Sequence, residues 1–306
     1  MSRRPSACQS ESIPPTLSRS PLGRRLLCFS FFLAFRSAFA AGEPAAPIPW
    51  AYSAYFGTGV YEVANGEKAY IFRVSPSWQW REAGVDDNGR RTIGWKFKFP
   101  VALGAHDLDA NAIGATLSLD NVSTITVVPG VEIDIPIGSR WSLRPFASLG
   151  WGTETGSASS SAWVYWTGVK SRLAFPGSDG FEWALVNSLT SSGYTNDAHQ
   201  SNRVLPLFTA FEFDRPIEKK IGGEPVHLYW HVGYTDYLKH EPLLLGSGVG
   251  SIDVEDEWEA GMAFGKGAEP LRFWRLHWNR VGIAYRFSSD GEFKGISVFF
   301  SSLFDR

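Results

Sequence analysis

Two side chains with complementary chemistry lie two positions apart in the run His199-Gln200-Ser201-Asn202. An imidazole can take the proton of a serine hydroxyl, which then attacks an ester carbonyl. Residues two apart on a strand share a face, so this spacing suits a base and its nucleophile. Such a base also needs a carboxylate or an amide to orient it. The sequence does not select this third group, and the candidates are Asn187, Asn196, Asp197, Glu212 and Asp214.

The run resembles the His-x-Ser-Asn motif of outer-membrane phospholipase A and the lipid A deacylases, where the histidine is the base and the serine the nucleophile. Here Arg203 stands where those families usually carry Gly. On a continuous strand, Glu212 and Asp214 would face away from Ser201, and Glu212 would lie near the far rim. The resemblance implies a lipid hydrolase in which His199 is the base and Ser201 is the nucleophile. This is the minority hypothesis. We favour a polar loop and predict no enzyme.

Two further groups carry side chains that could hold a metal. His227 and His231 share one face of a strand, but no third ligand is evident, so we predict that they line a polar interior. An acidic cluster could hold a divalent ion that bridges lipopolysaccharide phosphates, although a solvated rim is favoured. Its members are Asp253, Glu255, Asp256, Glu257 and Glu259. Neither a metal site nor a cofactor is predicted, because no zinc, phosphate-loop or nucleotide motif appears.

Composition narrows the class of protein that positions these groups. The 306 residues include 13 Trp, 10 Tyr, 22 Phe and 31 Gly, and 20% are charged, with a formal net charge of −2. That aromatic content argues against disorder, and the charge argues against nucleic acid as a partner. After residue 41, no apolar run approaches the roughly 18 residues of a membrane-spanning helix. An all-β protein remains.

The first forty residues read as a cleaved signal peptide. Arg24 and Arg25 precede an apolar run, and the small-residue site Ala38-Phe39-Ala40 follows it. Cleavage would remove both cysteines, six Arg and one Glu, which leaves 23 basic and 30 acidic residues and a net charge of −7. Residues 41–51 then form a short Pro-rich periplasmic lead, and residues 52–306 form the folded domain.

Apolar and polar residues alternate along most of residues 52–306. In the segment 68–80 one face carries Tyr70, Phe72, Val74, Trp78 and Trp80, and the opposite face is polar or small. Similar faces recur in 91–104, 124–137, 141–153, 204–214, 226–237 and 279–288. A period of two predicts strands, because a helix would need apolar residues three and four apart.

The connections alternate between two kinds. Short turns rich in Pro and Gly (136–140, 176–180, 265–270) are interleaved with longer or more polar loops (157–161, 196–203, 239–253). That layout is typical of an outer-membrane barrel, and about twelve strands can be counted. An even number places both termini at one end. We therefore predict a transmembrane antiparallel up-and-down β-barrel of about 12 strands.

A soluble β-sandwich is the alternative fold, since soluble sheets also alternate. Three features favour the membrane: strands of about 11–14 residues, aromatic residues near strand ends, and charges in mid-strand on the polar faces. Those charges are Arg73, Lys96, Lys98, Glu132, Asp134, Lys170, Arg172 and Arg286. Bulky residues such as Phe146, Trp166 and Tyr229 would fill part of the bore.

Several segments resemble the β-domains of autotransporters. Residues 141–152 look like one of their strands, the runs 131–137 and 211–217 repeat a pattern, and 293–304 resembles the last strand that the barrel-assembly machinery reads. The resemblance implies a solitary translocator-type barrel, structural or pore-like. Pro44, Pro47 and Pro49 forbid a regular helix before the first strand, so we expect no passenger. Expected partners are outer-membrane lipids, lipopolysaccharide and the assembly machinery.

Overall fold

The computed structural model describes residues 56–63, 66, 68–85, 91–106, 124–154, 161–178, 180–196, 201–221, 223–239, 243–244, 251–252, 254–266, 271–273, 276–278 and 280–305. The predicted signal peptide and the Pro-rich lead lie outside these residues. Everything below concerns the unit formed within residues 41–306. Among the described residues, no helix is long and apolar enough to cross a membrane.

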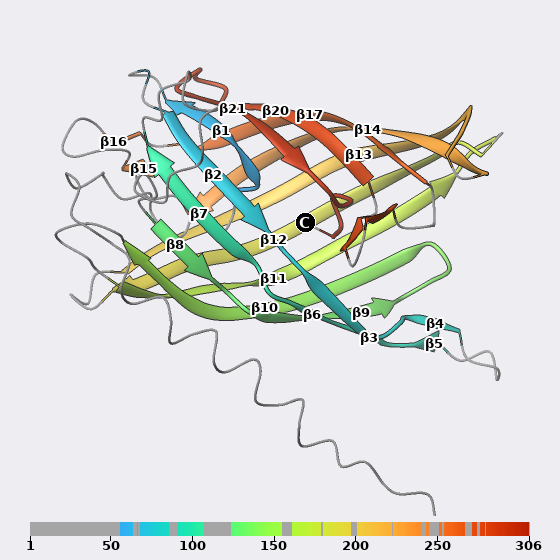
Figure 1. Cartoon of the computed structure of the whole chain (residues 1–306), viewed down its shortest axis with the longest axis horizontal. Coiled ribbons are helices and arrows are strands. Elements are labelled where there is room, and N and C mark those ends of the chain that lie inside the picture. Colours follow the sequence, from blue (N-terminus) through green and yellow to red (C-terminus); the bar gives the residue numbers. More distant parts are fainter. Residues whose placement is uncertain are drawn as a thin grey trace, which may run out of the picture. The chain divides into compact units, whose positions relative to one another are not determined.

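The described residues form strands almost throughout (Figure 1). Their bounds are β1 Thr58–Val63, β2 Lys68–Val74, β3 Ser77–Arg81, β4 Gly84–Val85, β5 Arg91–Thr92, β6 Gly94–Lys98, β7 Val101–His106, β8 Thr124–Val127, β9 Gly130–Pro136, β10 Trp141–Glu154, β11 Ser161–Pro176, β12 Glu182–Asn196, β13 Ser201–Ile221, β14 Glu224–Lys239, β15 Leu243–Leu244, β16 Ser251–Ile252, β17 Asp256–Gly265, β18 Leu271–Phe273, β19 Leu276–Trp278, β20 Arg280–Phe287 and β21 Phe293–Phe299.

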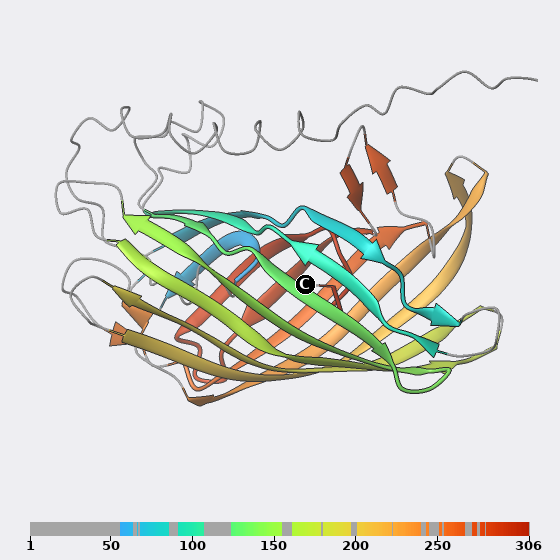
Figure 2. The ribbon, with the colours of Figure 1, turned by 90° about the horizontal axis from the view of Figure 1, so that it is seen from below.

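Twelve of these strands close into an antiparallel barrel in chain order, which confirms the predicted fold class (Figure 2). The ring runs β1-β2-β7-β8-β10-β11-β12-β13-β14-β17-β20-β21 and returns to β1. The β1–β21 ladder, from Thr58↔Val298 to Val63↔Phe293, joins the first strand to the last. Closure leaves no sheet edge along this ring, as a lipid environment requires.

Three neighbouring strands are interrupted at prolines. Pro76 separates β2 from β3, Pro100 separates β6 from β7, and Pro129 separates β8 from β9. The ladder continues across these breaks, because Phe99 N–H donates to Pro76 C=O at 2.9 Å and Val128 N–H donates to Pro100 C=O at 3.1 Å. Proline cannot donate, so each break marks a bend in its strand. The three bends form one continuous line, here called the proline crease.

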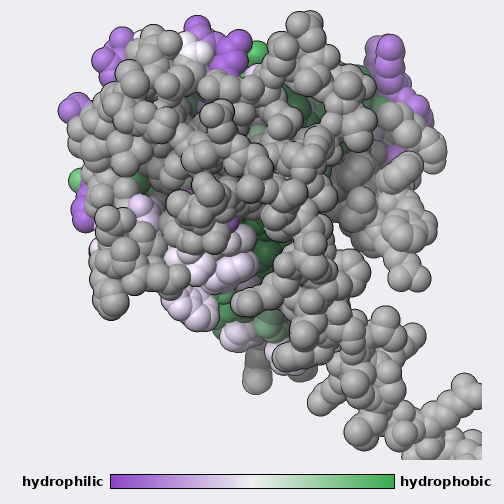
Figure 3. Space-filling view, turned by 60° about the vertical axis from the view of Figure 1, so that its left-hand side comes forward, coloured by the Kyte–Doolittle hydropathy of each residue, from purple (hydrophilic) through white to green (hydrophobic). Residues whose placement is uncertain are grey.

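The two faces of the strands differ as predicted. In β2, Ala69 and Ile71 point into the barrel and are buried, while Phe72 and Val74 point outward and are exposed. The same alternation gives an outward belt of large apolar residues, which includes Leu149, Leu189, Leu207, Val232, Met262, Ile283 and Ile296. In the space-filling view, hydrophobic residues are visible on the wall, and the most hydrophilic described residues lie at the margins (Figure 3).

Aromatic side chains gather outside the barrel near the strand ends. At one end, Phe175 stacks on Trp183 with ring centroids 3.9 Å apart, and Phe213 stacks on Trp230 at 5.5 Å. Others near the same end are Trp78, Trp80 and Trp95. Near the opposite end lie Trp151, Trp163, Tyr234, Trp258 and Phe287. These positions agree with the predicted pair of aromatic girdles.

The two kinds of connection lie at opposite ends, as the up-and-down order requires. Connections 137–140, 177–181 and 222–223 share one end, called the turn end below. The last residues of β10, β12 and β14 and the first residues of β11, β13 and β17 share the other, called the loop end. β1 begins and β21 ends at the turn end, as the even strand number predicts. The turn end also carries the β4–β5 hairpin.

The last strand is shorter than predicted. β21 ends at Phe299, and residues 300–305 turn into the barrel instead of continuing along its wall (Figure 1). Leu303 and Phe304 are buried, so Phe304 is not the outward aromatic that closes the strand. One reason is pairing: β1 begins at Thr58, opposite Val298, so β1 offers no residue to continue the ladder beyond that point.

Candidate functional site in the barrel lumen

Inward-facing charges from four strands meet around Glu132 of β9. Lys98 of β6 and Lys170 of β11 place their Nζ atoms 2.8 and 3.0 Å from Glu132 Oε1. Arg144 of β10 lies between Glu132 and Asp134, with Nη2 2.7 Å from Asp134 Oδ2. Alternation puts each of these side chains inside, since the residues on either side of it in the strand face outward.

The charged side chains of this cluster are almost fully buried, and their burial costs free energy. Glu132, Lys98, Arg144 and Lys170 are each at most 7% exposed. Removing a charge from water costs several kcal/mol, which an opposite charge at hydrogen-bond distance must offset. Glu132 contacts three cations, so it is the central counter-ion of the group.

A second charged cluster lies on β14, β17 and β20. Arg286 Nη1 is 3.1 Å from Glu257 Oε1, and His231 Nε2 is 2.6 Å from Glu259 Oε1. Both glutamates are 1% exposed and lie within the lumen. The predicted solvated acidic rim is therefore wrong for Glu257 and Glu259. The strand alternation carries them inward, where Arg286 provides the compensating charge.

A third set brings together Glu212, Asp214, His227 and Arg280. Glu212 Oε2 lies 2.9 Å from Arg280 Nη1, and Asp214 Oδ1 lies 2.6 Å from His227 Nδ1. Arg280 also stacks over the Tyr229 ring at 3.7 Å. The prediction that the two histidines line the interior is confirmed, and each imidazole binds its own carboxylate.

The residues of the hydrolase hypothesis do not come together in the described part of the chain. His199 lies outside the described residues, and so do Gln200 and the side chain of Asn202. Ser201 is exposed at the start of β13, where it pairs with Thr195. Glu212 lies on the opposite face of the same continuous strand and is bound to Arg280. Three of the five candidate orienting groups are thus engaged elsewhere: Glu212 with Arg280, Asp214 with His227, and Asn187, whose Oδ1 accepts from Thr209 Oγ1 at 2.9 Å.

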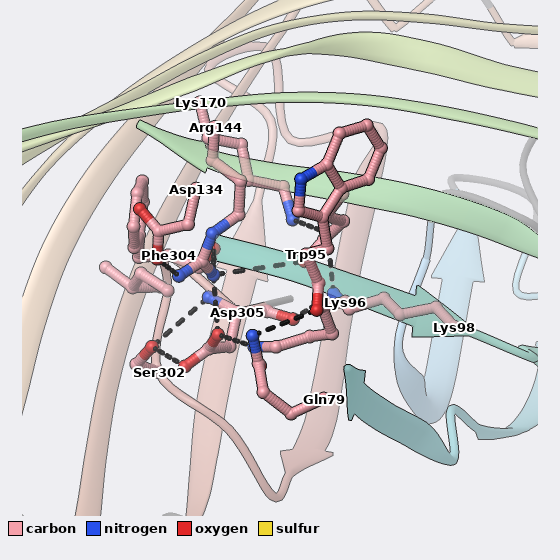
Figure 4. A network of polar contacts seen from close by, with 12 residues as sticks. Gln79, Trp95, Lys96, Lys98, Asp134, Arg144, Lys170, Ser302, Phe304 and Asp305 are labelled. Carbon is pink, nitrogen blue, oxygen red and sulfur yellow. Dashed lines mark hydrogen bonds and ion pairs between the residues drawn. The ribbon is translucent and has the colours of Figure 1, made fainter. Parts of the chain in front are cut away.

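Residues 301–305, called the inner segment below, enter the lumen at the turn end. Asp305 Oδ1 lies 2.6 Å from Arg144 Nη1 and 2.8 Å from Lys96 Nζ (Figure 4). Phe304 stacks against the Arg144 guanidinium at 4.0 Å, and its C=O accepts a hydrogen bond from Nη1 at 3.2 Å. Ser302 Oγ donates to Asp305 Oδ2 at 2.8 Å, which orients the carboxylate.

The charges around Asp305 govern its protonation. Burial alone would raise the pKa of its carboxyl, but Arg144, Lys96 and Lys98 outweigh burial and hold the pKa well below 3.8. Asp305 is therefore a carboxylate throughout the physiological range.

Aromatic side chains fill the lumen towards the loop end. Phe56 precedes β1 and stacks on Tyr61 at 4.8 Å and on Phe293 at 5.4 Å. Beside the proline crease, a cavity lined by residues such as Arg73 and Trp166 has room for about one water molecule. Phe146, Trp166 and Tyr229 are buried, as predicted for bulky lumen residues.

Sequence reasoning identified several of the lumen charges but missed Arg144 and Arg280, and it did not give the partners. Strand parity places Lys98, Glu132, Lys170 and Arg286 inside, and they are inside. Asp305 was missed, because the strand was predicted to run to residue 304. The signal that could have found it is the pair Ser301-Ser302, where the apolar alternation of the last strand stops.

Known structures with the same architecture provide a comparison. The chain resembles the translocator domain of autotransporter NalP from Neisseria meningitidis, with a TM-score of 0.54 and 11% identity, over 78% of this chain and 82% of that chain. The beta domain of the Bordetella autotransporter BrkA gives 0.49 at 11% identity, over 78% and 92%. The transport unit of AIDA-I from Escherichia coli gives 0.43 at 10% identity, over 80% and 88%.

At 11% identity, the likeness to the NalP domain shows a shared fold. The predicted resemblance to translocator-type barrels is thus confirmed at the level of the fold. No family model matches the sequence, and no curated protein matches it.

Proposed function

We propose that the chain is an outer-membrane β-barrel of translocator type, whose lumen is closed in its resting state. The observation that carries this proposal is the division of the wall into two faces. Large apolar side chains such as Leu149, Ile283 and Ile296 are about 60% exposed outside, while charged side chains are buried inside. A soluble protein would place these apolar groups in its core, and a membrane barrel presents them to lipid tails.

The girdles and the ring closure support the same placement. Aromatic residues at both ends of the belt suit the two membrane interfaces, and ring closure satisfies backbone hydrogen bonds along the wall. Outer-membrane lipids would contact the belt, lipopolysaccharide would surround the loop end, and the barrel-assembly machinery would insert the chain. The turn end would face the periplasm, because both terminal strands reach it. The fold of the NalP translocator domain is consistent with this placement.

A closed lumen gives the barrel a structural role in its resting state. The Glu132 cluster and the inner segment lie towards the turn end, and the Phe56 cluster lies towards the loop end together with Arg286 and its glutamates. We therefore expect little ion conductance from the intact barrel in a planar bilayer. No described group of residues favours an acyl hydrolase, and none is proposed.

The test is where the processed chain resides and how it behaves on a gel. We expect it in the outer-membrane fraction, extractable only with detergent, with a shift in gel mobility on boiling. A folded barrel resists the detergent of the gel until it is heated, and this causes the shift. Recovery of the processed chain in periplasmic extract without detergent would contradict the proposal.

A further inference from the structure

The inner segment is held by contacts that distinguish it from a loosely packed end of a strand. Its anchor is Arg144, which contacts the carboxylate of Asp305 and the carbonyl and ring of Phe304. Lys96 adds an ion pair to the Asp305 side chain, and Lys98 Nζ donates to the Asp305 C=O. These cations come from β6 and β10, which face β21 across the lumen.

Apolar and backbone contacts fix the middle of the segment against β12 and β13. Leu303 packs against Val186 of β12 and Ala210 of β13. The Leu303 N–H donates to Glu212 Oε2 at 3.4 Å. The segment therefore connects β12 and β13 with β6 and β10 through the lumen, and the C label lies within the outline of the barrel (Figure 2).

The charges of the wall explain why a carboxylate binds here. Without Asp305, the described residues of the cluster supply four cations, Lys96, Lys98, Arg144 and Lys170, and two carboxylates, Glu132 and Asp134. An excess of two positive charges in a buried site favours an anion. Arg144 and Lys96 converge on a single oxygen, Asp305 Oδ1, so the recognised group is specific in position as well as in charge.

We infer that Lys96, Lys98 and Arg144 form a carboxylate-binding site in the lumen, and that the inner segment is its tethered ligand, which closes the turn end. This inference rests on the proposed function, since it requires an assembled barrel. The site consists of wall residues, so it persists when the segment is removed and then accepts a carboxylate from a free peptide. The segment acts as a plug that can be deleted from the chain and added back as a free peptide.

The direct test uses a barrel that ends at Phe300 and a fluorescent peptide with the sequence of residues 301–306. Binding is measured by anisotropy in detergent, on protein first shown to be assembled by its heat-dependent mobility. We expect the peptide to bind, and a peptide with Asp305→Asn to bind at least about tenfold more weakly, because buried charge-assisted contacts are lost. The two peptides share the same apolar residues but differ by one charge, so a titration of each with protein-free micelles corrects for partition into detergent.

Variants of the wall locate the site. Lys96→Gln should weaken binding of the wild-type peptide severalfold and leave binding of the Asp305→Asn peptide unchanged. Lys294→Gln is the control, because Lys294 is half exposed and pairs with Glu62 on the barrel wall. An assembled barrel that binds both peptides equally, or neither, overturns the site. A chain that is not a membrane barrel in its intact form contradicts the proposed function instead.

A second measurement is available if the shortened chain does not assemble. Residues 41–306 contain no cysteine, so Ser302→Cys introduces a single thiol into the processed full-length chain. Its reaction with an impermeant maleimide should be at least about tenfold faster when Asp305→Asn is also present, since the segment is then released more often. Equal rates in the two assembled variants would overturn the inference.

Discussion

At the scale of single residues, the lumen depends on charges that compensate one another across strands. Glu132 is buried and contacts Lys98, Lys170 and Arg144, each from a different neighbouring element. Such a cluster links β6, β9, β10 and β11 beyond their backbone ladders. Its contribution is conditional, because any member that loses its partner becomes an uncompensated charge in a poorly hydrated space.

Replacing the central carboxylate should therefore be costly. Glu132→Gln leaves three buried cations with reduced compensation, and we expect the free energy of unfolding to fall by about 3–5 kcal/mol. Urea titration of the detergent-refolded barrel measures the change. Glu62→Gln is the matched control: Glu62 pairs with Lys294 at 2.9 Å, but Lys294 is half exposed and Glu62 about one-third exposed, and no measurable loss is expected. Equal losses in both variants would refute the role assigned to Glu132.

The carboxylate of the inner segment gives a pH dependence with a definite sign. The pKa of Asp305 is lowered on folding, so its stabilising effect is complete above its unfolded value, near 3.8, and is lost only as pH falls towards the lower folded value. The difference in urea midpoint between the wild type and Asp305→Asn should stay constant from pH 8 to about pH 5. A difference that vanishes already at about pH 6 would contradict the ion pairs with Arg144 and Lys96.

Strand parity predicted which residues face inward, but it could not predict which charges meet. Parity follows from local sequence, because side chains alternate along any strand. Partners depend on register across strands far apart in sequence: Glu212 and Arg280 are 68 residues apart, and Lys96 and Asp305 are 209 apart. Glu257 and Glu259 illustrate the limit, since they look like a solvated acidic run until β20 places Arg286 beside them.

At the scale of the element, the proline crease shows how a wall can bend and stay paired. At Pro129 the β8–β9 chain is interrupted without a change of register against β10, and Leu149 N–H of β10 donates to the Pro129 C=O at 3.0 Å. Gly150 lies opposite this break. A Cβ there would overlap the Val127 carbonyl and lie 2.5 Å from the Val128 Cα. Backbone atoms cannot move aside cheaply, so this position requires glycine.

Adding a single methyl group at Gly150 therefore tests how tightly the backbone packs at the proline crease. Gly150→Ala should lower the free energy of unfolding by about 1–3 kcal/mol, through displacement of the β8–β9 backbone. Gly138→Ala is the control, because the nearest atoms to a Cβ there are 3.9 Å away, and its change should stay within about 0.5 kcal/mol. Heat-dependent mobility and urea titration report both. A tolerated Gly150→Ala would show that the backbone at the β8–β9 break is not tightly packed against β10.

The last strand shows why element ends are harder to predict than element faces. Ile296 and Val298 follow the predicted alternation, and Ile296 is exposed on the outer wall. The end at Phe299 is set by the neighbouring β1, which begins at Thr58, and by the cations that bind Asp305 across the lumen. Neither determinant is local to residues 293–305, so the segment's own pattern could not reveal it.

At the scale of the whole molecule, number and order of strands were predictable because each turn or loop interrupts the alternation. Twelve strands, an alternating order of connections and two aromatic girdles all follow from local signals repeated along the chain. Closure itself needs the β1–β21 pairing, which joins residues about 240 positions apart and has no local signature. The fold class could therefore be predicted from the alternation that repeats along the chain. The contacts that fill the lumen depend on the closed ring of strands.

The proposed function requires that lipid surrounds the outer belt of the barrel. One substitution in this belt distinguishes a lipid environment from water. Ile283 is 61% exposed in β20, and its ladder partners Met262 and Val298 place it within the belt. Ile283→Arg should cost about 2–4 kcal/mol when the barrel is in a bilayer, because a charge would face hydrocarbon. In water the same change at an exposed site would be nearly neutral. Refolding into phosphatidylcholine vesicles, followed by urea titration, measures the difference.

The control for that experiment is Ser178→Arg, at an exposed position in the turn that joins β11 to β12 and lies beyond the girdle. The same added charge there should leave stability and insertion unchanged, since the turn remains in water. The contrast between the two arginines isolates the environment of the belt from the effect of charge itself. If both variants insert and unfold like the wild type, the apolar belt does not face lipid, and the membrane assignment fails although the barrel fold stands.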